Sequence, residues 1–335
     1  MKKLSVIFTL LVAAVIILTG CGPAATPTPT VVVPTQPPAP TATEVPPPAL
    51  GTADNPIVVA FEPSGTSTEI TAGGQELLDA LSKETGLTFK GVVPTSYAAL
   101  TEAMGSGNAQ IGWMATFAYI LAHQKGYADV ALITVRFGSD HYGSQFLANV
   151  DAGFTPAADK PGTEDELKPT LSQFAGKKAC FVDPESTSGY VIPMIFLKNA
   201  GLTDADIPDP VFTGGHTQTV QALYDGGICD FGTTYVDARS SIAKDHPDVN
   251  DKVVVIYQTQ AIIPNDNMSF APDMPQELRD KITVAMLKLS ATEEGKKALK
   301  DLYQISGLTA VDDTVYDQFR SYLTSSGIDL SQFVK

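Results

Sequence analysis

Positively charged side chains are scarce in this sequence of 335 residues. It has 22 Lys and Arg residues against 37 Asp and Glu residues, which gives a formal net charge of -15 at pH 7. This acidic excess excludes nucleic acid as a partner, because nucleic acids are bound through clustered Lys and Arg. The only arginines are Arg136, Arg239, Arg279 and Arg320. We therefore expect an anionic ligand to be bound mainly by neutral hydrogen-bond donors rather than by an arginine cluster.

Histidine and cysteine, which commonly bind transition metals, are sparse as well. The histidines are His123, His141, His216 and His246. They show no metal-ligand spacing, so the sequence predicts no metal site. Cys180 and Cys229 each lie in an apolar, strand-like stretch. Two such cysteines are more often separate small core residues than partners in a disulfide. A disulfide is the alternative if the protein works in an oxidising compartment.

Beyond the N-terminus the sequence contains no long apolar run. The N-terminal run, residues 4–18, follows Lys2 and Lys3 and ends shortly before Cys21. This arrangement predicts a secretory signal peptide over residues 1–20. A single anchor helix is the alternative, although the run is shorter than the roughly 20 residues that span a bilayer. The ending Leu-Thr-Gly-Cys resembles the lipobox of bacterial lipoproteins, which implies that Cys21 carries the lipid that attaches the chain to a membrane.

Residues 21–54 are rich in Pro, Thr and Ala. Such a composition does not bury a hydrophobic core, and repeated prolines favour extended polyproline II structure. We expect a semi-rigid spacer that holds a folded domain off the membrane. The protein would then work outside the cytoplasm, anchored by lipid on the periplasmic or cell-surface side of a bacterial membrane.

From residue 55 onward, apolar strand patterns alternate with amphipathic helix patterns. Strands are expected at residues 57–61, 88–93 and 109–114, with helices at 71–85 and 98–105 between them. The same order returns later, with strands at residues 177–182, 210–213 and 228–232 and helices at 190–200 and 218–224. Each β-α-β-α-β series predicts a parallel sheet whose loops at the carboxyl ends of the strands are open to ligand.

These two series predict an α/β protein of two lobes, each an open, mostly parallel sheet flanked by helices. Residues 55–141 are expected to form the first part of lobe one, residues 142–263 lobe two, and residues 264–335 the second part of lobe one. Strands are also expected at residues 142–150 and 267–271, and their flanks could carry the chain from lobe one to lobe two and back. Residues 275–335 are expected to be mostly helical and to pack on lobe one.

The segment Asp183-Pro184-Glu185-Ser186-Thr187-Ser188-Gly189-Tyr190 joins an expected strand to an expected helix. Its hydroxyls fall at the helix N-terminus, where backbone N–H groups lack partners and the helix dipole adds a partial positive charge. This arrangement favours a phosphate-like or carboxylate ligand. The alternative is an ordinary capped helix, because Ser and Thr are preferred N-cap residues.

Several motifs along the chain resemble those of one known family. They are Pro94-Thr95-Ser96-Tyr97, residues 183–190, Gly214-Gly215-His216 and Ile263-Pro264-Asn265-Asp266. In this order, after a lipobox and a spacer, they resemble the phosphonate/phosphite/phosphate-type (PhnD-like) substrate-binding lipoproteins of ABC importers. The resemblance implies a type II periplasmic-binding-protein-like fold, a small phosphorus oxyanion as ligand, and an ABC permease with its ATPase as partner. It also implies a monomer that needs no cofactor and is not an enzyme.

The resemblance implies a ligand site between the lobes. In lobe two the implied ligand residues are Ser186, Thr187, Ser188, His216, Tyr235 and Asp237. The hydroxyls and His216 would donate to the oxyanion, His216 more strongly if protonated, and Tyr235 would form an aromatic wall. Asp237 would select a protonated oxyanion or an aminophosphonate, because a carboxylate repels an oxyanion unless a proton or an ammonium lies between them. For His216 and Asp237 the alternative is an ordinary loop residue.

In lobe one and the first crossover the implied ligand residues are Tyr97, Thr116, Tyr142 and Ser144. Tyr97 would wall and hydrogen-bond the ligand, and Thr116 would donate to it. Tyr142 and Ser144 would either touch the ligand or order the hinge. Weaker candidates are Phe117 and Tyr119, for which core packing is an equal explanation, and Ser64, Gly65 and Thr66, which also suit an ordinary turn.

Other classes of protein are alternatives to a substrate-binding protein of an ABC importer. Ser241 and Lys244 match the Ser-x-x-Lys pattern of penicillin-recognising enzymes, but the sequence contains neither the partner motifs nor a base placed against a nucleophile. A receptor that feeds a sensor instead of a transporter would have the same ligand site. Related folds also bind other small organic ligands, which is a further alternative.

Overall fold

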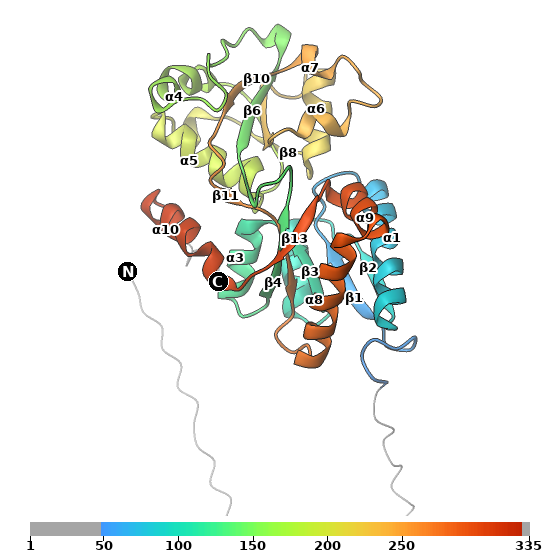
Figure 1. Cartoon of the computed structure of the whole chain (residues 1–335). Helices are drawn as coiled ribbons and strands as arrows, with labels where there is room; N and C mark the ends of the chain where they lie inside the picture. The colour runs from blue at the N-terminus through green and yellow to red at the C-terminus, as the bar shows by residue number, and fades with distance from the viewer. Residues whose placement is uncertain (1–47, 330–335) are drawn as a thin grey trace, which may run out of the picture. The chain divides into compact units, whose positions relative to one another are not determined.

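Two sheets joined by a short two-stranded link organise the computed structural model, which describes residues 48–329 (Figure 1). The predicted signal peptide, the lipidation site Cys21 and most of the predicted spacer lie outside these described residues. Within the described part, no helix is both long enough and apolar enough to span a bilayer. The predicted α/β fold with two lobes is confirmed.

Lobe one contains the six-stranded sheet, with strand order β13-β4-β12-β3-β1-β2. Its strands are β1 (Ile57–Phe61), β2 (Phe89–Val92), β3 (Ile111–Met114), β4 (Asp129–Val135), β12 (Asn267–Phe270) and β13 (Gly307–Ala310). β1 pairs in parallel with β2 and β3, as the first predicted series requires. β12 is antiparallel to β3 and β4, and β13 is antiparallel to β4. The sheet is therefore mixed rather than mostly parallel, because β12, which returns from lobe two, enters in the opposite direction to β3.

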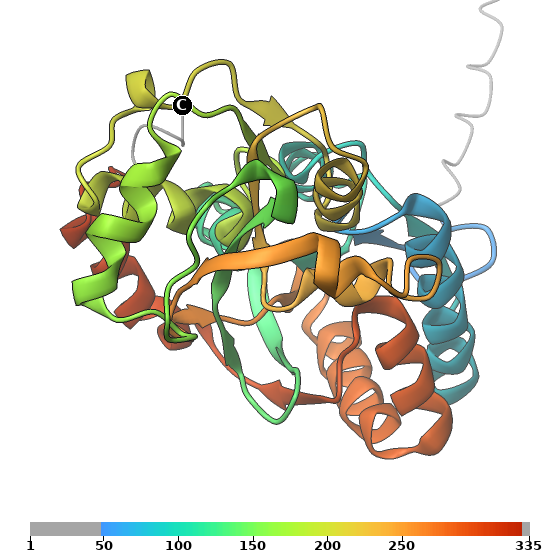
Figure 2. The same ribbon diagram turned by 90° about the horizontal axis from the view of Figure 1, so that it is seen from above.

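Helices cover both faces of this sheet. They are α1 (Ser67–Thr85), α2 (Tyr97–Gly105), α3 (Thr116–Gln124), α8 (Gln276–Ala291), α9 (Glu293–Tyr303) and α10 (Asp317–Ser325). α8 and α9 pack beside α1 (Figure 2). A Cβ atom on Gly73 of α1 would lie 2.8 Å from the Cα atom of Leu302, so glycine is needed for the end of α9 to approach α1 this closely. The C-terminal segment is mostly helical, as predicted, and its strand β13 extends the first sheet.

Lobe two contains the five-stranded sheet, with strand order β10-β6-β9-β7-β8. Its strands are β6 (Ser144–Asn149), β7 (Ala179–Phe181), β8 (Val211–Phe212), β9 (Phe231–Tyr235) and β10 (Val253–Gln258). Its helices are α4 (Glu164–Leu171), α5 (Ile192–Asn199), α6 (His216–Asp225) and α7 (Val249–Lys252). β7 pairs in parallel with β8 and β9, as the second series predicts, whereas β6 is antiparallel to β9 and β10. This sheet is mixed as well.

The loop before β9 differs from the prediction. β9 begins at Phe231 rather than at Ile228, whose side chain is exposed. Cys229 lies in this loop and forms a disulfide with Cys180 of β7. The less expected of the two alternatives for these cysteines is therefore the one that the structure contains.

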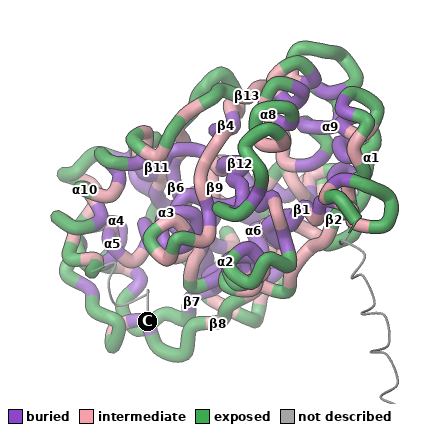
Figure 3. The backbone as a smooth tube through the Cα atoms, turned by 90° about the horizontal axis from the view of Figure 1, so that it is seen from below, coloured by how far each residue is buried: buried purple, intermediate pink, exposed green. Residues whose placement is uncertain are grey.

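The link between the lobes consists of β5 (His141–Tyr142) and β11 (Ile263–Pro264), which pair antiparallel. Single turns complete the chain: η1 (Val150–Ala152), η2 (Ser172–Phe174), η3 (Thr187–Val191), η4 (Asp204–Asp206), η5 (Ala238–Ser241) and η6 (Asp313–Tyr316). The inner strands β3, β7 and β12 are buried, whereas the edge strands β2, β8 and β13 and the outer turns of the helices are partly or fully exposed (Figure 3). One buried cluster contains Phe117 of α3, Ile192 of α5 and Phe319 of α10. The lobes therefore share hydrophobic packing in addition to the link.

Candidate functional site

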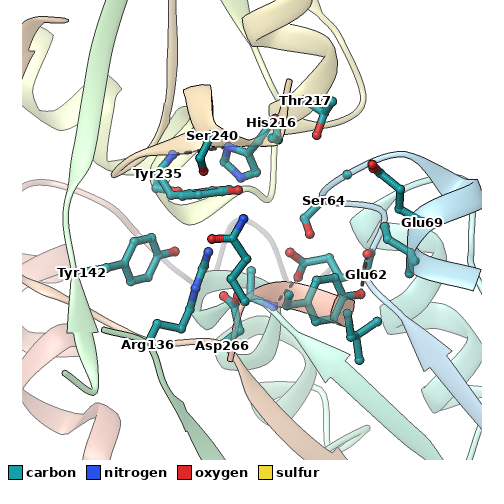
Figure 4. Close-up of a pocket in the computed structure, with 18 of the residues that line it drawn as sticks. Glu62, Ser64, Glu69, Arg136, Tyr142, His216, Thr217, Tyr235, Ser240 and Asp266 are labelled. Carbon is teal, nitrogen blue, oxygen red and sulfur yellow. Dashed lines mark hydrogen bonds between the residues drawn. The ribbon is translucent and has the colours of Figure 1, made fainter. Parts of the chain in front are cut away.

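A cavity of about 400 Å³ lies between the two lobes (Figure 4). The part of its lining that we call the inner cleft comprises Glu62, Arg136, Tyr142, Ser186, Ser188, His216, Tyr235 and Asp266, which are all buried or half-buried. Hydrogen bonds join the lobes beside it. The backbone N–H of His216 donates to the carbonyl of Ser64 at 2.8 Å, and Nε2 of Gln218 donates to the carbonyl of Gly65 at 3.2 Å. The lobes are therefore in direct contact around the cavity.

The hydroxyl segment Ser186, Thr187 and Ser188 begins a helical stretch after β7, as the sequence predicts, and all three residues are buried. Ser186 and Ser188 line the cavity. Thr187 does not, because its Oγ1 accepts a hydrogen bond from the backbone N–H of Phe117 in lobe one at 2.9 Å. Ser186 Oγ also accepts from the backbone N–H of Gly189 at 3.2 Å, so it caps η3 and borders the cavity at once. Ser186 can thus cap a helical segment and belong to the candidate ligand site at the same time.

His216 is the first residue of α6, and its ring packs against the ring of Tyr235. Nδ1 of His216 accepts a hydrogen bond from the backbone N–H of Tyr235 at 3.4 Å, so Nε2 carries the proton of the neutral ring. Burial, together with the charge of Arg136, lowers the pKa of His216 to about 3. His216 is therefore a neutral donor at pH 7, and its protonated form, which would donate more strongly, is not populated at that pH.

Arg136 is a cation in the inner cleft that sequence analysis did not identify. It follows β4, and its guanidinium carbon lies 4.6 Å from the centre of the Tyr235 ring in lobe two. Its Nε is buried and has no hydrogen-bond partner among the residues that the structure describes. An unpaired, buried guanidinium N–H is energetically costly, and an anion would satisfy it. One arginine, not a cluster, thus lies among the expected neutral donors; the available signal was an arginine directly after the apolar stretch 130–135.

Two carboxylates, Glu62 and Asp266, lie with Arg136 on the lobe-one side of the inner cleft (Figure 4). Glu62 follows β1, and its Oε2 accepts a hydrogen bond from the backbone N–H of Ala115. Burial raises the pKa of Glu62 well above its usual range, and the charge of Asp266 adds to this effect. Burial also raises the pKa of Asp266 to about 6, although Arg136 opposes the shift. Neither was singled out from the sequence, even though Asp266 ends one of the family motifs.

The predicted tyrosines occupy different positions. Tyr142 of the link and Tyr235 of β9 line the cavity. Tyr97, the first residue of α2, is fully buried outside the lining, and its hydroxyl has no hydrogen-bond partner within residues 48–329. Burial raises the pKa of Tyr97 well above its usual range, and the charge of Glu62 adds to it. Tyr97 is therefore a neutral phenol adjacent to the inner cleft rather than part of its lining.

Three further predicted ligand residues are engaged elsewhere, and none lines the cavity. Thr116 Oγ1 donates to a backbone carbonyl of β11 at 2.5 Å. Ser144 Oγ donates to the carbonyl of Ser188 at 2.6 Å, which supports the expected role in ordering the hinge. Asp237 caps η5 and pairs with Arg239, whose Nη2 lies 2.6 Å from Asp237 Oδ2. The structure therefore does not bring the carboxylate of Asp237 to the inner cleft.

The weaker candidates from lobe one divide into two groups. Ser64 and Gly65 border the cavity, whereas Thr66 is the N-cap of α1. Phe117 and Tyr119 are fully buried in the hydrophobic interior, in agreement with core packing.

Ser241, the serine of the Ser-x-x-Lys match, borders the cavity in η5. Lys244 is exposed, and Ser241 Oγ has no hydrogen-bond partner in the described part of the chain. A serine nucleophile needs an oriented base within hydrogen-bond reach. The geometry around Ser241 does not supply one.

The family model for the ABC-transporter phosphonate periplasmic substrate-binding protein matches residues 59–316. The phosphate-import protein PhnD of Mycolicibacterium smegmatis is 33% identical over 189 residues, which cover 53% of this chain and 54% of that protein. The chain thus matches about half the length of this relative.

Two solved structures resemble the chain along most of its length. A binding-protein component of an ABC phosphonate transporter from Pseudomonas aeruginosa has a TM-score of 0.69 and 20% identity, covering 83% of this chain and 96% of its own. PhnD1 from Prochlorococcus marinus (MIT 9301) in complex with methylphosphonate has a TM-score of 0.71 and 16% identity, covering 82% and 98%. At these identities the likeness establishes the fold.

Proposed function

We propose, because this chain belongs to the family of periplasmic substrate-binding proteins of ABC phosphonate transporters, that it captures a small phosphorus oxyanion between its lobes and delivers it to an ABC importer. The ligand class comprises phosphonate, phosphite and phosphate. The observation that carries this proposal is the convergence of Ser186, Ser188, His216 and Arg136 on one cavity. A phosphate-import relative and a methylphosphonate-bound neighbour support the same ligand class.

The oxyanion would be held by neutral donors of lobe two and by one cation of lobe one. The hydroxyls of Ser186 and Ser188 and the Nε2–H of His216 donate without carrying charge. Arg136 supplies the positive charge and a buried Nε–H that needs an acceptor. Because the closed lobes exclude water, each of these hydrogen bonds acts in a lower dielectric than at the surface.

Glu62 and Asp266 take the selective role that the sequence had assigned to Asp237. A carboxylate beside an oxyanion is repulsive unless a proton or an ammonium lies between them. The raised pKa of both groups favours such a shared proton. A ligand with a P–OH or ammonium group would be accepted, whereas sulfate would leave a buried acceptor unpaired.

The rest of the chain serves delivery in this proposal. Residues 55–141 and 264–335 form one lobe, residues 142–263 form the other, and the link of β5 and β11 is the hinge. Cys21 would carry lipid after removal of residues 1–20 and hold a monomeric receptor outside the cytoplasm. An ABC permease with its ATPase would take up the ligand. No catalytic step is proposed, because Ser241 has no base beside it.

Isothermal titration of the full chain against phosphate, phosphite, methylphosphonate and sulfate tests this function. We expect one-to-one binding of at least one phosphorus oxyanion and weak or no binding of sulfate. Ser186→Ala should weaken binding by roughly 10-fold or more, because a hydrogen bond to a charged group contributes about 1.5–3 kcal/mol. No heat with any phosphorus oxyanion, from protein shown to be folded and ligand-free, would overturn the proposal.

Thr163→Ala is the matched control for Ser186→Ala. Thr163 is also an N-cap residue of lobe two, at the start of α4, and it does not line the cavity. Its loss should lower stability by about 1 kcal/mol, as N-cap substitutions do, without changing affinity. If both variants weaken binding equally, helix capping rather than ligand contact explains the role of Ser186.

A further inference from the structure

The interlobe cavity continues beyond the inner cleft toward solvent. Its outer lining includes Ser240, Ser241, Lys300 and Gln304, which we call the outer cleft, and beside them the carboxylate residues Glu69 and Asp301. Ser240 and Ser241 belong to η5 of lobe two, and Lys300 and Gln304 lie at the end of α9 of lobe one. Ser240 and Lys300 are exposed, in contrast to the buried Ser186 and Ser188 of the inner cleft. The outer cleft is therefore the mouth of the same cavity.

The cavity is larger than an inorganic oxyanion requires. The cavity measures about 400 Å³ although hydrogen bonds from His216 and Gln218 already join the lobes beside it. It extends from the buried Ser186 and Ser188 to the exposed Ser240 and Lys300. An oxyanion held in the inner cleft therefore leaves space toward the mouth for a substituent on the phosphorus.

The polar groups of the outer cleft have unused hydrogen-bonding capacity. Ser241 Oγ is buried without a partner in the described part of the chain. Lys300 forms no ion pair within residues 48–329, and the adjacent Asp301 is already paired with Lys297 at 2.7 Å. The amide of Gln304 makes no side-chain hydrogen bond among the described residues and borders the same cavity. A hydroxyl, an ammonium and an amide are thus available to a polar ligand group.

Gln304 occupies a backbone position that ordinarily favours glycine. It is the C-cap of α9, with φ 56 and ψ 32, in the left-handed region. Helices usually place Gly or Asn at such an end, because other side chains are strained there. A strained backbone that presents a polar side chain to a cavity is a feature found at ligand-binding positions.

We propose that the outer cleft binds a short hydroxylated substituent, so that the preferred ligand is a hydroxylated organophosphorus monoester rather than inorganic phosphate, phosphite or a simple alkylphosphonate. Ser241 and Gln304 would hydrogen-bond the hydroxyls of the substituent from the two lobes. Lys300 would add a donor at the mouth. This inference rests on the proposed function and narrows its ligand class.

Titration of the full chain with phosphate, methylphosphonate and glycerol phosphate tests the inference. Glycerol phosphate should bind about 30-fold more tightly than phosphate and methylphosphonate, which is the factor expected for about 2 kcal/mol from two added hydrogen bonds. Gln304→Gly and Ser241→Ala should each reduce that preference by about 3- to 10-fold and leave the affinity for methylphosphonate unchanged. Gln304→Gly should keep the melting temperature near that of the parent, because glycine adopts this φ without strain.

Asp209→Gly is the matched control for Gln304→Gly. Asp209 also has a positive φ, of 44, and it is exposed outside the cavity. This control should change neither affinity. Equal or tighter binding of phosphate than of glycerol phosphate, or equal loss of all ligands in Gln304→Gly, would overturn the outer cleft as a substituent site. Absence of binding by all phosphorus compounds would instead overturn the proposed function itself.

Discussion

The two lobes contribute different chemistry to the inner cleft. Lobe two supplies neutral donors, Ser186, Ser188 and His216, from the starts of two helical segments. Lobe one supplies charged or titratable groups: Glu62 and Arg136 follow β1 and β4, and Asp266 directly precedes β12. A donor at a helix start is positioned by its own segment, whereas a buried charge is tolerated only with partners from elsewhere in the fold. Neutral donors and charged or titratable groups are thus divided between the lobes, and each set can be altered separately.

The largest expected effect concerns the structure of lobe two rather than its chemistry. The disulfide Cys180–Cys229 closes a loop across a sequence separation of 49. The double substitution Cys180→Ala with Cys229→Ala should lower the free energy of unfolding by about 3–4 kcal/mol, because a cross-link of this span restricts the unfolded chain. Chemical denaturation measures this loss.

Ligand affinity of the folded disulfide-free variant should equal that of the parent, because neither cysteine lines the cavity. A loss of stability below about 1 kcal/mol would contradict the contribution expected of a cross-link. A large loss of affinity in folded protein would instead link the loop before β9 to the cleft.

Arg136→Met should produce the largest effect on binding. It removes the only arginine of the cavity lining and leaves Glu62 and Asp266 without an opposing charge. Affinity for the phosphorus oxyanion should fall by about 100-fold, or about 3 kcal/mol, as expected for a buried charged hydrogen bond. Titration calorimetry measures the change.

Arg279→Met is the control for Arg136→Met. Arg279 pairs with Asp129 at 3.0 Å in lobe one and does not border the cavity. It should affect stability and leave affinity unchanged. If the parent and Arg136→Met bind the ligand equally well, Arg136 does not contribute to binding. The neutral donors of lobe two would then be the binding groups.

The same division between the lobes explains what the sequence could predict. The hydroxyl segment and His216 were found because each is a continuous motif at a predicted strand-to-helix junction. Arg136 was missed because strand β4 was not predicted and only the fold brings it to Tyr235. Asp237 had the expected residue type, but Arg239, only two positions along the chain, pairs with it. Both β-α-β-α-β series were predictable from local patterns, whereas the antiparallel strands depend on long-range pairing that local patterns do not encode.

The pH at which His216 is protonated tests its assignment as a neutral donor of lobe two. Its pKa is lowered to about 3 by burial, so protonation favours the unfolded state as the pH falls below about 6.5, the ordinary value. Between pH 7.5 and pH 5 the parent should lose about 2 kcal/mol of stability through this group. In His216→Asn this contribution is absent, so its stability relative to the parent should improve at pH 5. Denaturation at the two pH values measures it, and a pH-independent difference would mean that His216 titrates normally.

The contribution of Asp266 in lobe one to the pH dependence of stability should have the opposite sign to that of His216 in lobe two. This opposition tests the difference between the lobes most directly. Burial raises its pKa to about 6, so the folded protein binds this proton more tightly than the unfolded chain does. The contribution of Asp266 to the stability of the folded protein is therefore fully present below the ordinary pKa of this group and is lost as the pH rises through about 6. In Asp266→Asn this loss of stability is absent. The free energy of unfolding of the variant minus that of the parent should therefore increase by about 1–2 kcal/mol as the pH rises from 5 to 8. Denaturation series of the parent, Asp266→Asn and His216→Asn at these pH values give the two slopes. Slopes of the same sign would mean that the lobes do not divide neutral and titratable chemistry in this way.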